Sequence, residues 1–405
     1  MLLGEANFSF TISFLNYCEP KFITTTCFES KDQLVKYNPE LVQNNLNKLS
    51  ELNVFPLFAI DACNLEKHFA REKFDRVIFM FPHVSGRSNL KKNRDLMNRF
   101  FISCKNVLAD ENSAIFVSLA KGQGGTSFEM EPEKRLNKDS WTINEIAQKN
   151  DFILTDCFEF KKDKFPYYVS TGFRNQHRSF LTQSGLVHKF QLSTKFQNFD
   201  LNHPIKLIEN FMSIYLGKQI NGQIVKEKLN FDLNDLKDFR EIPRERYEIQ
   251  FANEHKQKLE KINTHLCFDV SGYLKELFAL DDIRMVFSKD PRVLKSEEVN
   301  DKFKLKKKIV QFSIDRLKWN HDISFWYDVE NFDLNEFLDV LRSSSIHIRF
   351  IKLVDSFNSC DKYAHCFRLV YESCDQALDW DSSVKIQEQV RLNLTSKLGN
   401  TLILR

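Results

Sequence analysis

Apolar and polar positions in the first third of the chain alternate between strand-like runs and helix-like spacing. Residues 22–28, 54–60 and 74–81 are short apolar runs rich in β-branched and aromatic residues, which is typical of buried strands. Residues 39–52 carry leucines at the spacing of an amphipathic helix, and residues 113–120 form a further strand-like run. This alternation predicts an α/β domain with a Rossmann-like, mostly parallel sheet.

The start of the chain predicts a strand, a tight turn and a helix. Three apolar residues run into Gly4, and a helical pattern follows from Phe10. Glycine allows close approach of the backbone to a ligand, and the helix N-terminus offers unpaired N–H groups, although an ordinary strand-to-helix turn has the same spacing. Because three residues precede the turn, we expect a shortened first strand.

Polar side chains follow the predicted strands. Glu29 and Asp61 each follow one strand, and Pro82 and His83 follow the most apolar one. Lys121 opens a Gly-rich stretch after the fifth strand. Open α/β sheets bind ligands at this edge, although single strand-end acids and histidines are also common in loops. The absence of a G-x-G-x-x-G motif argues against a dinucleotide and favours a smaller ligand such as S-adenosylmethionine.

Composition limits the class of protein. A chain of 405 residues with 42% hydrophobic content predicts two or three domains. The formal net charge of +3 does not indicate nucleic-acid binding by itself, so local clusters must carry that argument. Nine cysteines without repeated C-x-x-C pairs or a secretory signal predict reduced thiols in an intracellular protein and no metal site. No apolar stretch approaches 18 residues, so we expect no membrane span.

The last hundred residues predict a second fold. The expected elements are a strand at 321–327, a helix at 334–341, strands at 346–354 and 366–371, a helix at 382–398 and a strand at 401–404. This β-α-β-β-α-β order is that of the ferredoxin-like split unit. Ser382 and Ser383 suit the N-cap of the long helix, and Gly399 suits its end. We expect the side chains of Phe325 and Trp326 both to lie in the core of this domain.

Two stretches near the start resemble a known family. Residues 4–10, Gly-Glu-Ala-Asn-Phe-Ser-Phe, and residues 74–84, which include Phe-Pro-His, resemble the corresponding motifs of the large-subunit rRNA uridine-N3 methyltransferase family. The resemblance covers residues 1–185 and implies a Rossmann-like S-adenosylmethionine methyltransferase domain. It places Gly4, Glu5, Asn7 and Ser9 around the methionine end of the cofactor, Glu29 near the ribose, Asp61 near the adenine, and Pro82 and His83 toward the target base.

Two positions depart from that family's pattern. Ala6 replaces a glycine, which requires a negative φ at this position. Met80 replaces an asparagine whose amide could hold the target base. Methylation of uridine N3 requires loss of its proton, so His83 or Lys121 would act as base or as stabiliser of the charged ring. The alternative is a non-catalytic RNA-binding adaptor.

Two later parts of the chain resemble parts of phenylalanyl-tRNA synthetases. Residues 269–294 are similar to the end of the catalytic domain, with Ser271 and Gly272 at the position of the ATP-binding Glu-Arg, which predicts no aminoacylation. Residues 322–326 and 353–357 are similar to the ferredoxin-fold anticodon-binding domain, which implies contact with tRNA, whereas the RNA that serves as substrate could be rRNA or tRNA. The expected phosphate-contacting residues are Lys307, Lys308, Arg349, Lys352 and Arg368.

The order of these parts resembles the ferredoxin-fold anticodon-binding-domain-containing protein family. We therefore expect a Rossmann-like methyltransferase-like domain at 1–185, a linker with the degenerate synthetase-like segment at 186–303, and an α+β ferredoxin-like domain at 304–405. The expected cofactor is S-adenosylmethionine, and the expected location is the cytoplasm or the nucleolus.

Overall fold

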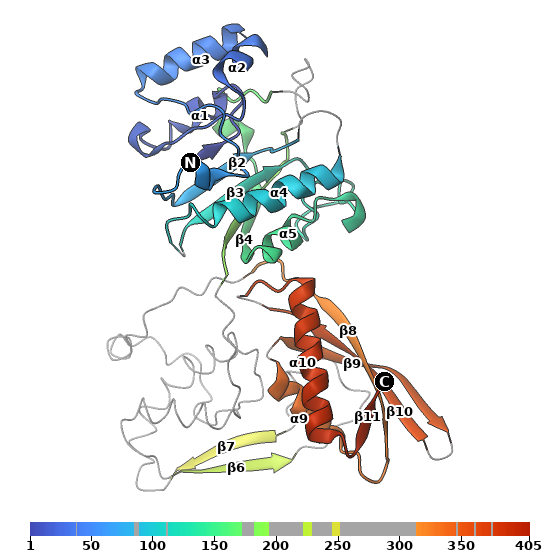
Figure 1. Cartoon of the computed structure of the whole chain (residues 1–405). Coiled ribbons are helices and arrows are strands. Elements are labelled where there is room, and N and C mark those ends of the chain that lie inside the picture. The colour runs from blue at the N-terminus through green and yellow to red at the C-terminus, as the bar shows by residue number, and fades with distance from the viewer. Residues whose placement is uncertain are drawn as a thin grey trace. The chain divides into compact units, whose positions relative to one another are not determined.

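The computed structural model describes residues 1–37, 39–84, 89–110, 112–171, 182–193, 222–228, 245–251, 313–345, 347–359, 362–373 and 376–405. The chain divides into two compact units (Figure 1). The first unit comprises Met1–Lys195, Gln311–Asp315 and Asp375–Ala377, and the second comprises Phe196–Val310, Arg316–Cys374 and Leu378–Arg405.

The first unit is built on a five-stranded sheet in the order β1-β2-β3-β5-β4. Its strands are β1 (Leu2–Leu3), β2 (Arg76–Met80), β3 (Ala114–Leu119), β4 (Phe152–Glu159) and β5 (Leu186–Leu192). The first three are parallel, and β5 is antiparallel to both of its neighbours. Strand β5 follows residue 185, so this sheet continues beyond the predicted end of the first domain.

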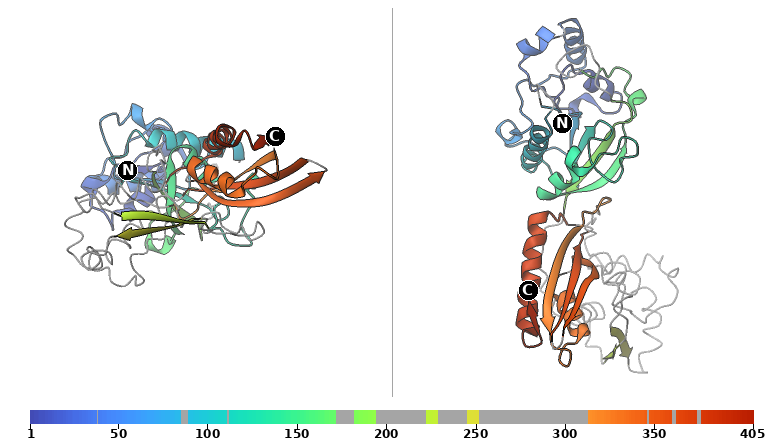
Figure 2. Two further views of the ribbon diagram at one scale, coloured as in Figure 1. Left: turned by 90° about the horizontal axis from the view of Figure 1, so that it is seen from below. Right: turned by 90° about the vertical axis from the view of Figure 1, so that its right-hand side faces the viewer.

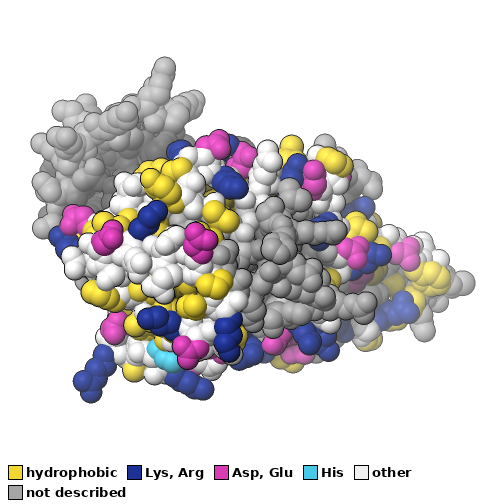
Figure 3. Space-filling view, turned by 90° about the horizontal axis from the view of Figure 1, so that it is seen from above, with side chains coloured by type: hydrophobic (Ala, Val, Ile, Leu, Met, Phe, Trp, Pro, Cys, Tyr) yellow, Lys and Arg dark blue, Asp and Glu magenta, His cyan; other side chains and the backbone are white. Residues whose placement is uncertain are grey.

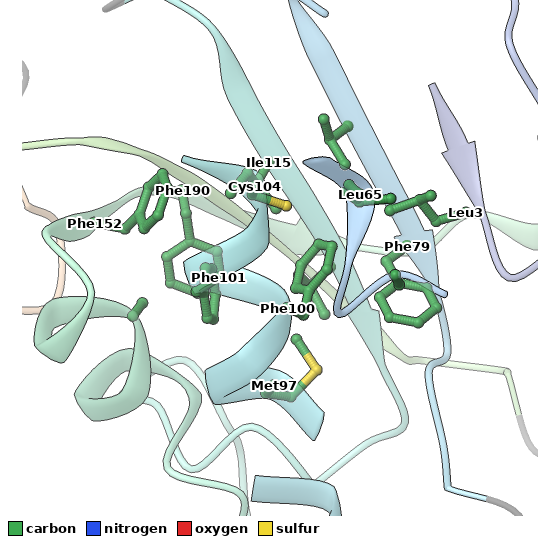
Figure 4. Packing of buried hydrophobic residues seen from close by; sticks show 14 of the residues in the cluster. Leu3, Leu65, Phe79, Met97, Phe100, Phe101, Cys104, Ile115, Phe152 and Phe190 are labelled. Carbon is green, nitrogen blue, oxygen red and sulfur yellow. The ribbon is translucent and has the colours of Figure 1, made fainter. Parts of the chain in front are cut away.

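Both faces of this sheet are covered, as the near-continuous apolar run of β2 predicts. Val77 and Phe79 pack with one core cluster, whereas Ile78 and Met80 pack with the cluster on the opposite face. Figure 4 shows the first cluster, in which α4 presents its apolar side chains to the sheet. The residues labelled there are Leu3, Leu65, Phe79, Met97, Phe100, Phe101, Cys104, Ile115, Phe152 and Phe190.

Five α-helices and four short 3₁₀ helices accompany this sheet in the part of the first unit that is described. The helices are α1 (Ser9–Phe14), α2 (Lys31–Tyr37), α3 (Pro39–Glu51), α4 (Leu90–Cys104) and α5 (Ile143–Lys149). The 3₁₀ helices are Pro20–Phe22, Leu65–Lys67, Asn137–Asp139 and Lys162–Lys164. The predicted strand, turn and helix at the start of the chain and the predicted helix at 39–52 are therefore confirmed.

The predicted strands at 22–28 and 54–60 are wrong as full strands. They contribute isolated parallel bridges, Leu2 to Thr25 and Thr26 to Leu57. The first run is shortened because a 3₁₀ helix that begins at Pro20 takes up Phe22. The second is broken because Ala59 has a positive φ of 56°. These bridges extend the sheet past β1, so its parallel part follows the 3-2-1-4-5 order of a doubly wound fold.

The second unit contains the predicted β-α-β-β-α-β order. Its elements are β8 (Trp319–Tyr327), α9 (Leu334–Ser344), β9 (Ile348–Ser359), β10 (Lys362–Tyr371), α10 (Trp380–Leu398) and β11 (Leu402–Leu404). They form an antiparallel sheet in the order β11-β8-β10-β9. The core lies between the sheet and the two helices, and Figure 2 shows α10 along one face of the sheet. The ferredoxin-like prediction is confirmed.

Two local predictions for this unit need correction. Asp379, not Ser382 or Ser383, caps α10, because its carboxylate accepts a hydrogen bond from Ser382 N at 2.9 Å. Phe325 is fully buried as predicted, but Trp326 lies on the opposite face of the sheet, because successive strand residues alternate between faces. The α10 helix does end at Gly399.

Between the two sheets along the chain, β6 (Gly222–Lys228) and β7 (Glu245–Phe251) form an antiparallel pair. The predicted helix at 205–216 and the synthetase-like residues 269–294 lie outside the described residues. In the described part of the chain, no helix combines the length and the apolar character that crossing a membrane requires.

Candidate functional site

The candidate site is the edge of the first sheet at which its parallel strands end. Hydrogen bonds of 2.9 Å from Glu5 N to Thr26 O and of 2.8 Å from Cys27 N to Leu57 O keep three successive segments side by side. The residues that follow β1, β2 and β3 reach the same edge, because these strands are parallel. The structure thus brings the predicted strand-end residues to one edge.

Gly4 makes the turn after β1 possible. Its φ is +69°, and a Cβ atom built on it would lie 2.6 Å from Cε2 of Phe79. Both the backbone conformation and the space therefore require glycine. Ala6 is not among the residues with positive φ, so the methyl group that replaces the family glycine is tolerated by the backbone.

Glu5 is buried, and it holds the start of helix α1. Its Oε2 accepts hydrogen bonds from Thr11 N and Thr11 Oγ1, each at 3.2 Å, and Thr11 Oγ1 lies 2.7 Å from Thr25 Oγ1. The Thr11 N–H belongs to the first turn, where it has no partner within the helix. Burial raises the pKa of Glu5 to about 7, and the hydrogen bonds from Thr11 oppose this shift.

Asn7 and Ser9 fasten a distant segment over the opening turn. Asn7 Nδ2 donates to Val169 O at 2.9 Å, and Val169 N donates to Ser9 Oγ at 3.0 Å. Asn7 Oδ1 also accepts from Ser9 N at 3.0 Å. In the same two segments, Phe10 packs against Tyr168 with 5.6 Å between ring centroids. The polar atoms of Asn7 and Ser9, which the family resemblance places around the cofactor, thus form hydrogen bonds within the protein.

The two strand-end acids differ in their surroundings. Asp61 organises its own turn, since Oδ1 accepts from Cys63 N at 2.9 Å and Oδ2 accepts from Asn64 Nδ2 at 2.5 Å. Glu29 is half-buried, and its Oε2 accepts from Cys27 Sγ at 3.3 Å. A carboxylate can accept several hydrogen bonds, so Glu29 suits a hydroxyl-bearing ligand better than Asp61 does.

After β2, Pro82 is buried and His83 is half-buried. His83 Nδ1 lies 2.6 Å from Val84 O, and its Nε2 lies 3.4 Å from Asn93 Nδ2. Asn93 Oδ1 in turn accepts from Val84 N at 2.9 Å. His83 therefore belongs to a hydrogen-bonded cluster with α4.

After β3, the side chain of Lys121 pairs with Glu133 at 2.8 Å in a partly exposed ion pair. The Gly-rich stretch that it opens is held by Glu129, which accepts from Gly122 N at 2.7 Å and from Gly124 N at 3.0 Å. Burial raises the pKa of Glu129, although these backbone N–H groups oppose the shift.

Met80, which replaces the family asparagine, lies on the face of β2 that packs toward Phe10. Its Sδ accepts a hydrogen bond from Ser118 Oγ at 3.1 Å. A thioether is only a weak acceptor and has no donor, so Met80 cannot supply the hydrogen bonds of an amide to a base.

In the second unit, the predicted phosphate-contacting residues have different environments. Lys352 is exposed, whereas the guanidinium of Arg368 is held by Asp322 through two hydrogen bonds of 2.7 and 2.8 Å. Arg349 lies on β9, and Lys307 and Lys308 lie outside the described residues. The pairing of Arg368 with both Asp322 and Lys352 in the sheet places all three on one face.

The same sheet face carries aromatic side chains. Trp326 contacts Phe357 edge to face with 5.7 Å between centroids, and the guanidinium of Arg405 lies 5.0 Å from the Trp326 ring centre. Phe357 is 50% exposed and Ile403 is 68% exposed, so part of this face is open to solvent.

Sequence patterns missed two buried asparagines of the site. Asn93 and Asn45 are buried, and Asn45 Nδ2 donates to Asn7 O at 2.8 Å. Both asparagines lie in amphipathic helices, where a polar residue is normally assigned to the solvent face. The sequence indicates their burial only through helical spacing, which places each of them on the apolar face of its helix. Asn93, for example, lies four residues before Met97 and therefore on the same face.

Comparisons with known proteins match the part of the chain that contains the motifs at this edge. A family model described as rRNA (uridine-N3-)-methyltransferase BTM5-like matches residues 1–172. A 25S rRNA (uridine(2634)-N(3))-methyltransferase of Saccharomyces cerevisiae is 26% identical over 215 residues, which cover 42% of this chain and 64% of the relative.

Two further relatives each match part of the chain. The ferredoxin-fold anticodon-binding domain-containing protein 1 homolog of Mus musculus is 34% identical over 201 residues, which cover 49% of this chain and 32% of the relative. The mitochondrial phenylalanine–tRNA ligase of Mus musculus is 27% identical over 132 residues, 30% of this chain and 28% of the relative. The match spans about a third of the first relative's length. The chain therefore carries a BMT5-like sequence over its first 172 residues and is similar to the ferredoxin-fold anticodon-binding domain-containing proteins.

Proposed function

We propose that this protein is an S-adenosylmethionine-dependent RNA methyltransferase that acts on N3 of a uridine. The observation that carries the proposal is the BMT5-like match over residues 1–172, whose motif residues meet at the edge where the parallel strands of the first sheet end. The relative from Saccharomyces cerevisiae is named for uridine-N3 methylation of rRNA. An rRNA substrate would place the protein in the cytoplasm or the nucleolus, and tRNA is the other candidate substrate.

The residues at this edge fit the cofactor. The carboxylate of Glu29 would accept hydrogen bonds from the ribose hydroxyls, and the turn at Gly4 would bring backbone close to the methionine end. Asn7 and Ser9 would help to form the binding site for the methionine end, because their hydrogen bonds hold the segment around Val169 in place. Asp61 would border the adenine through the turn that it organises. When bound, the cofactor supplies an electrophilic methyl group.

The protein would contribute mainly position and charge to the reaction. N3 of the uridine must lose its proton before or while its bond to the methyl carbon forms. Lys121 follows the strand next to that of His83, and its ammonium group would stabilise the negative charge that develops on the uracil ring. Pro82 and His83 would form the wall against which the base lies.

The open sheet face of the second unit would bind the RNA. Trp326 and Phe357 offer surfaces for stacking of unpaired bases, and Lys352 and Arg405 add positive charge. On the face of the molecule shown in Figure 3, Lys and Arg side chains are interspersed with Asp and Glu side chains.

A second candidate function is that of an RNA-binding adaptor without catalysis. Met80 favours it, because this thioether accepts from Ser118 and cannot donate to a base.

Methyl transfer to RNA distinguishes the two. The full chain is incubated with labelled S-adenosylmethionine and either rRNA or tRNA, and the digested RNA is examined for 3-methyluridine. We expect this product, and we expect Trp326→Ala to raise KM for RNA roughly 5- to 150-fold with little change in kcat, since one stacked base contributes about 1–3 kcal/mol. Trp326→Phe should keep most of the affinity. RNA binding without any methylated product would support the adaptor, and an unchanged KM for Trp326→Ala would remove the sheet face from the proposal.

A further inference from the structure

Asn93 is a polar residue in an apolar environment. It lies on α4 and is 1% exposed, and the same helix buries Met97 and Phe100 against the sheet. A buried amide must find partners for its donor and acceptor atoms. For Asn93 these partners lie in the turn after β2, at His83 and Val84.

The backbone fixes which way the Asn93 amide points. Val84 N, a backbone donor, lies 2.9 Å from Asn93 Oδ1. An N–H group can only donate, so the oxygen of the amide must face it. The NH₂ group of Asn93 therefore faces Nε2 of His83, at 3.4 Å.

The same reasoning fixes the proton on His83. Its Nδ1 lies 2.6 Å from the carbonyl oxygen of Val84, which can only accept, so Nδ1 carries a proton. In the neutral ring Nε2 then has a lone pair, and this lone pair faces the NH₂ group of Asn93. In the other neutral tautomer, the Nε2–H group would face the NH₂ donor of Asn93, and the lone pair of Nδ1 would face the carbonyl oxygen of Val84. Neither pair could form a hydrogen bond.

We propose that Asn93 is a positioning residue that holds His83 as the Nδ1–H tautomer and thereby fixes the turn from Pro82 to Val84. The importance of this turn for methyl transfer rests on the proposed function. In this arrangement both ring nitrogens of His83 are engaged by the protein, so His83 shapes the wall of the site and takes no proton from the uridine. The proton of N3 leaves to solvent.

The tautomer of His83 tests the proposal by NMR. The full chain is labelled with ¹⁵N in its histidines, and the ring signals of His83 are assigned by their loss in His83→Gln. For the neutral ring we expect a protonated Nδ1 and an unprotonated Nε2. Asn93→Asp keeps an acceptor for Val84 N but places a second acceptor at Nε2, so Nε2 should gain a proton.

Asn98→Asp provides the matched control on the same helix, because the side chain of Asn98 accepts from Asn150 and not from the turn. It should leave the His83 ring signals unchanged. An Nε2–H tautomer or a mixture in the unsubstituted protein would overturn the proposal, as would an unchanged His83 ring in Asn93→Asp. If Asn93→Asp fails to fold, the tautomer of the unsubstituted protein still decides. None of these NMR results depends on cofactor binding. Failure of the Asn93 proposal can therefore be distinguished from failure of the methyltransferase proposal.

Discussion

Replacement of Gly4 by alanine is expected to destabilise the first unit by about 2–5 kcal/mol. A non-glycine residue at a φ of +69° costs about 1–2 kcal/mol, and pressing an extra methyl group against a buried side chain costs about 1–3 kcal/mol. The methyl group would meet Phe79, which is 7% exposed and packs against Phe100 with 5.0 Å between ring centroids. Phe79 therefore has little room to move.

Hydrogen exchange followed by mass spectrometry measures this effect, because it reports the two units separately. In Gly4→Ala, peptides from β2 and β3 should exchange faster, whereas peptides from β8 and β10 should not. Gly4→Ala combined with Phe79→Leu, compared with Phe79→Leu alone, should show a smaller loss, because the clash is relieved and the backbone strain remains. Unchanged exchange in Gly4→Ala would contradict the conformation assigned to the opening turn.

Replacement of Glu5 by glutamine is expected to change how stability depends on pH. Burial raises the pKa of Glu5 from 4.5 to about 7, so the folded state favours the neutral acid. Below pH 4.5 both folded and unfolded states hold the proton, and there is no penalty. As the pH rises from 4.5 to about 7, the unfolded state ionises first, so the free energy of unfolding falls. The full penalty is about 3 kcal/mol at higher pH.

Glutamine keeps an acceptor for Thr11 N and never ionises. The stability of Glu5→Gln relative to the unsubstituted protein should therefore increase from pH 4.5 to pH 7 and then level off. Hydrogen exchange of peptides from α1 and β2 over this range measures the difference. Glu72→Gln, at an exposed position, is the control and should give a constant difference. If the difference in stability between Glu5→Gln and the unsubstituted protein did not change with pH, the claim that burial raises the pKa of Glu5 would be wrong.

Local pattern predicts the elements of this protein where one physical cause dominates. The apolar run of β2 predicts a central strand because both of its faces are covered. Gly4 predicts the opening turn because few other residues adopt its φ. In the second unit, alternating strand residues and two amphipathic helices predict the order of all six elements.

Contacts between distant residues are the part that local pattern does not predict. The hydrogen bond from Asn7 to Val169 joins positions that are 162 residues apart. The segments around Thr25 and Leu57 form single bridges, although their composition suits full strands. Asn93 is missed because its role depends on a turn in another part of the fold. In each case tertiary contacts decide what the local sequence leaves open.

Titration of the full chain with S-adenosylmethionine by calorimetry tests the central claim most directly. Gly4 is unsuitable for blocking the site, since a side chain there would disturb the fold itself. Glu29→Ala removes a half-buried carboxylate at the strand end instead, and Glu19→Ala, whose exposed side chain pairs with Lys21, is the control. We expect saturable binding by the unsubstituted chain and by Glu19→Ala, with a loss of affinity of about tenfold or more in Glu29→Ala, since hydrogen bonds to a charged group contribute roughly 1.5–3 kcal/mol. No binding by the folded, unsubstituted chain would contradict the methyltransferase proposal and leave the RNA-binding face as the functional part.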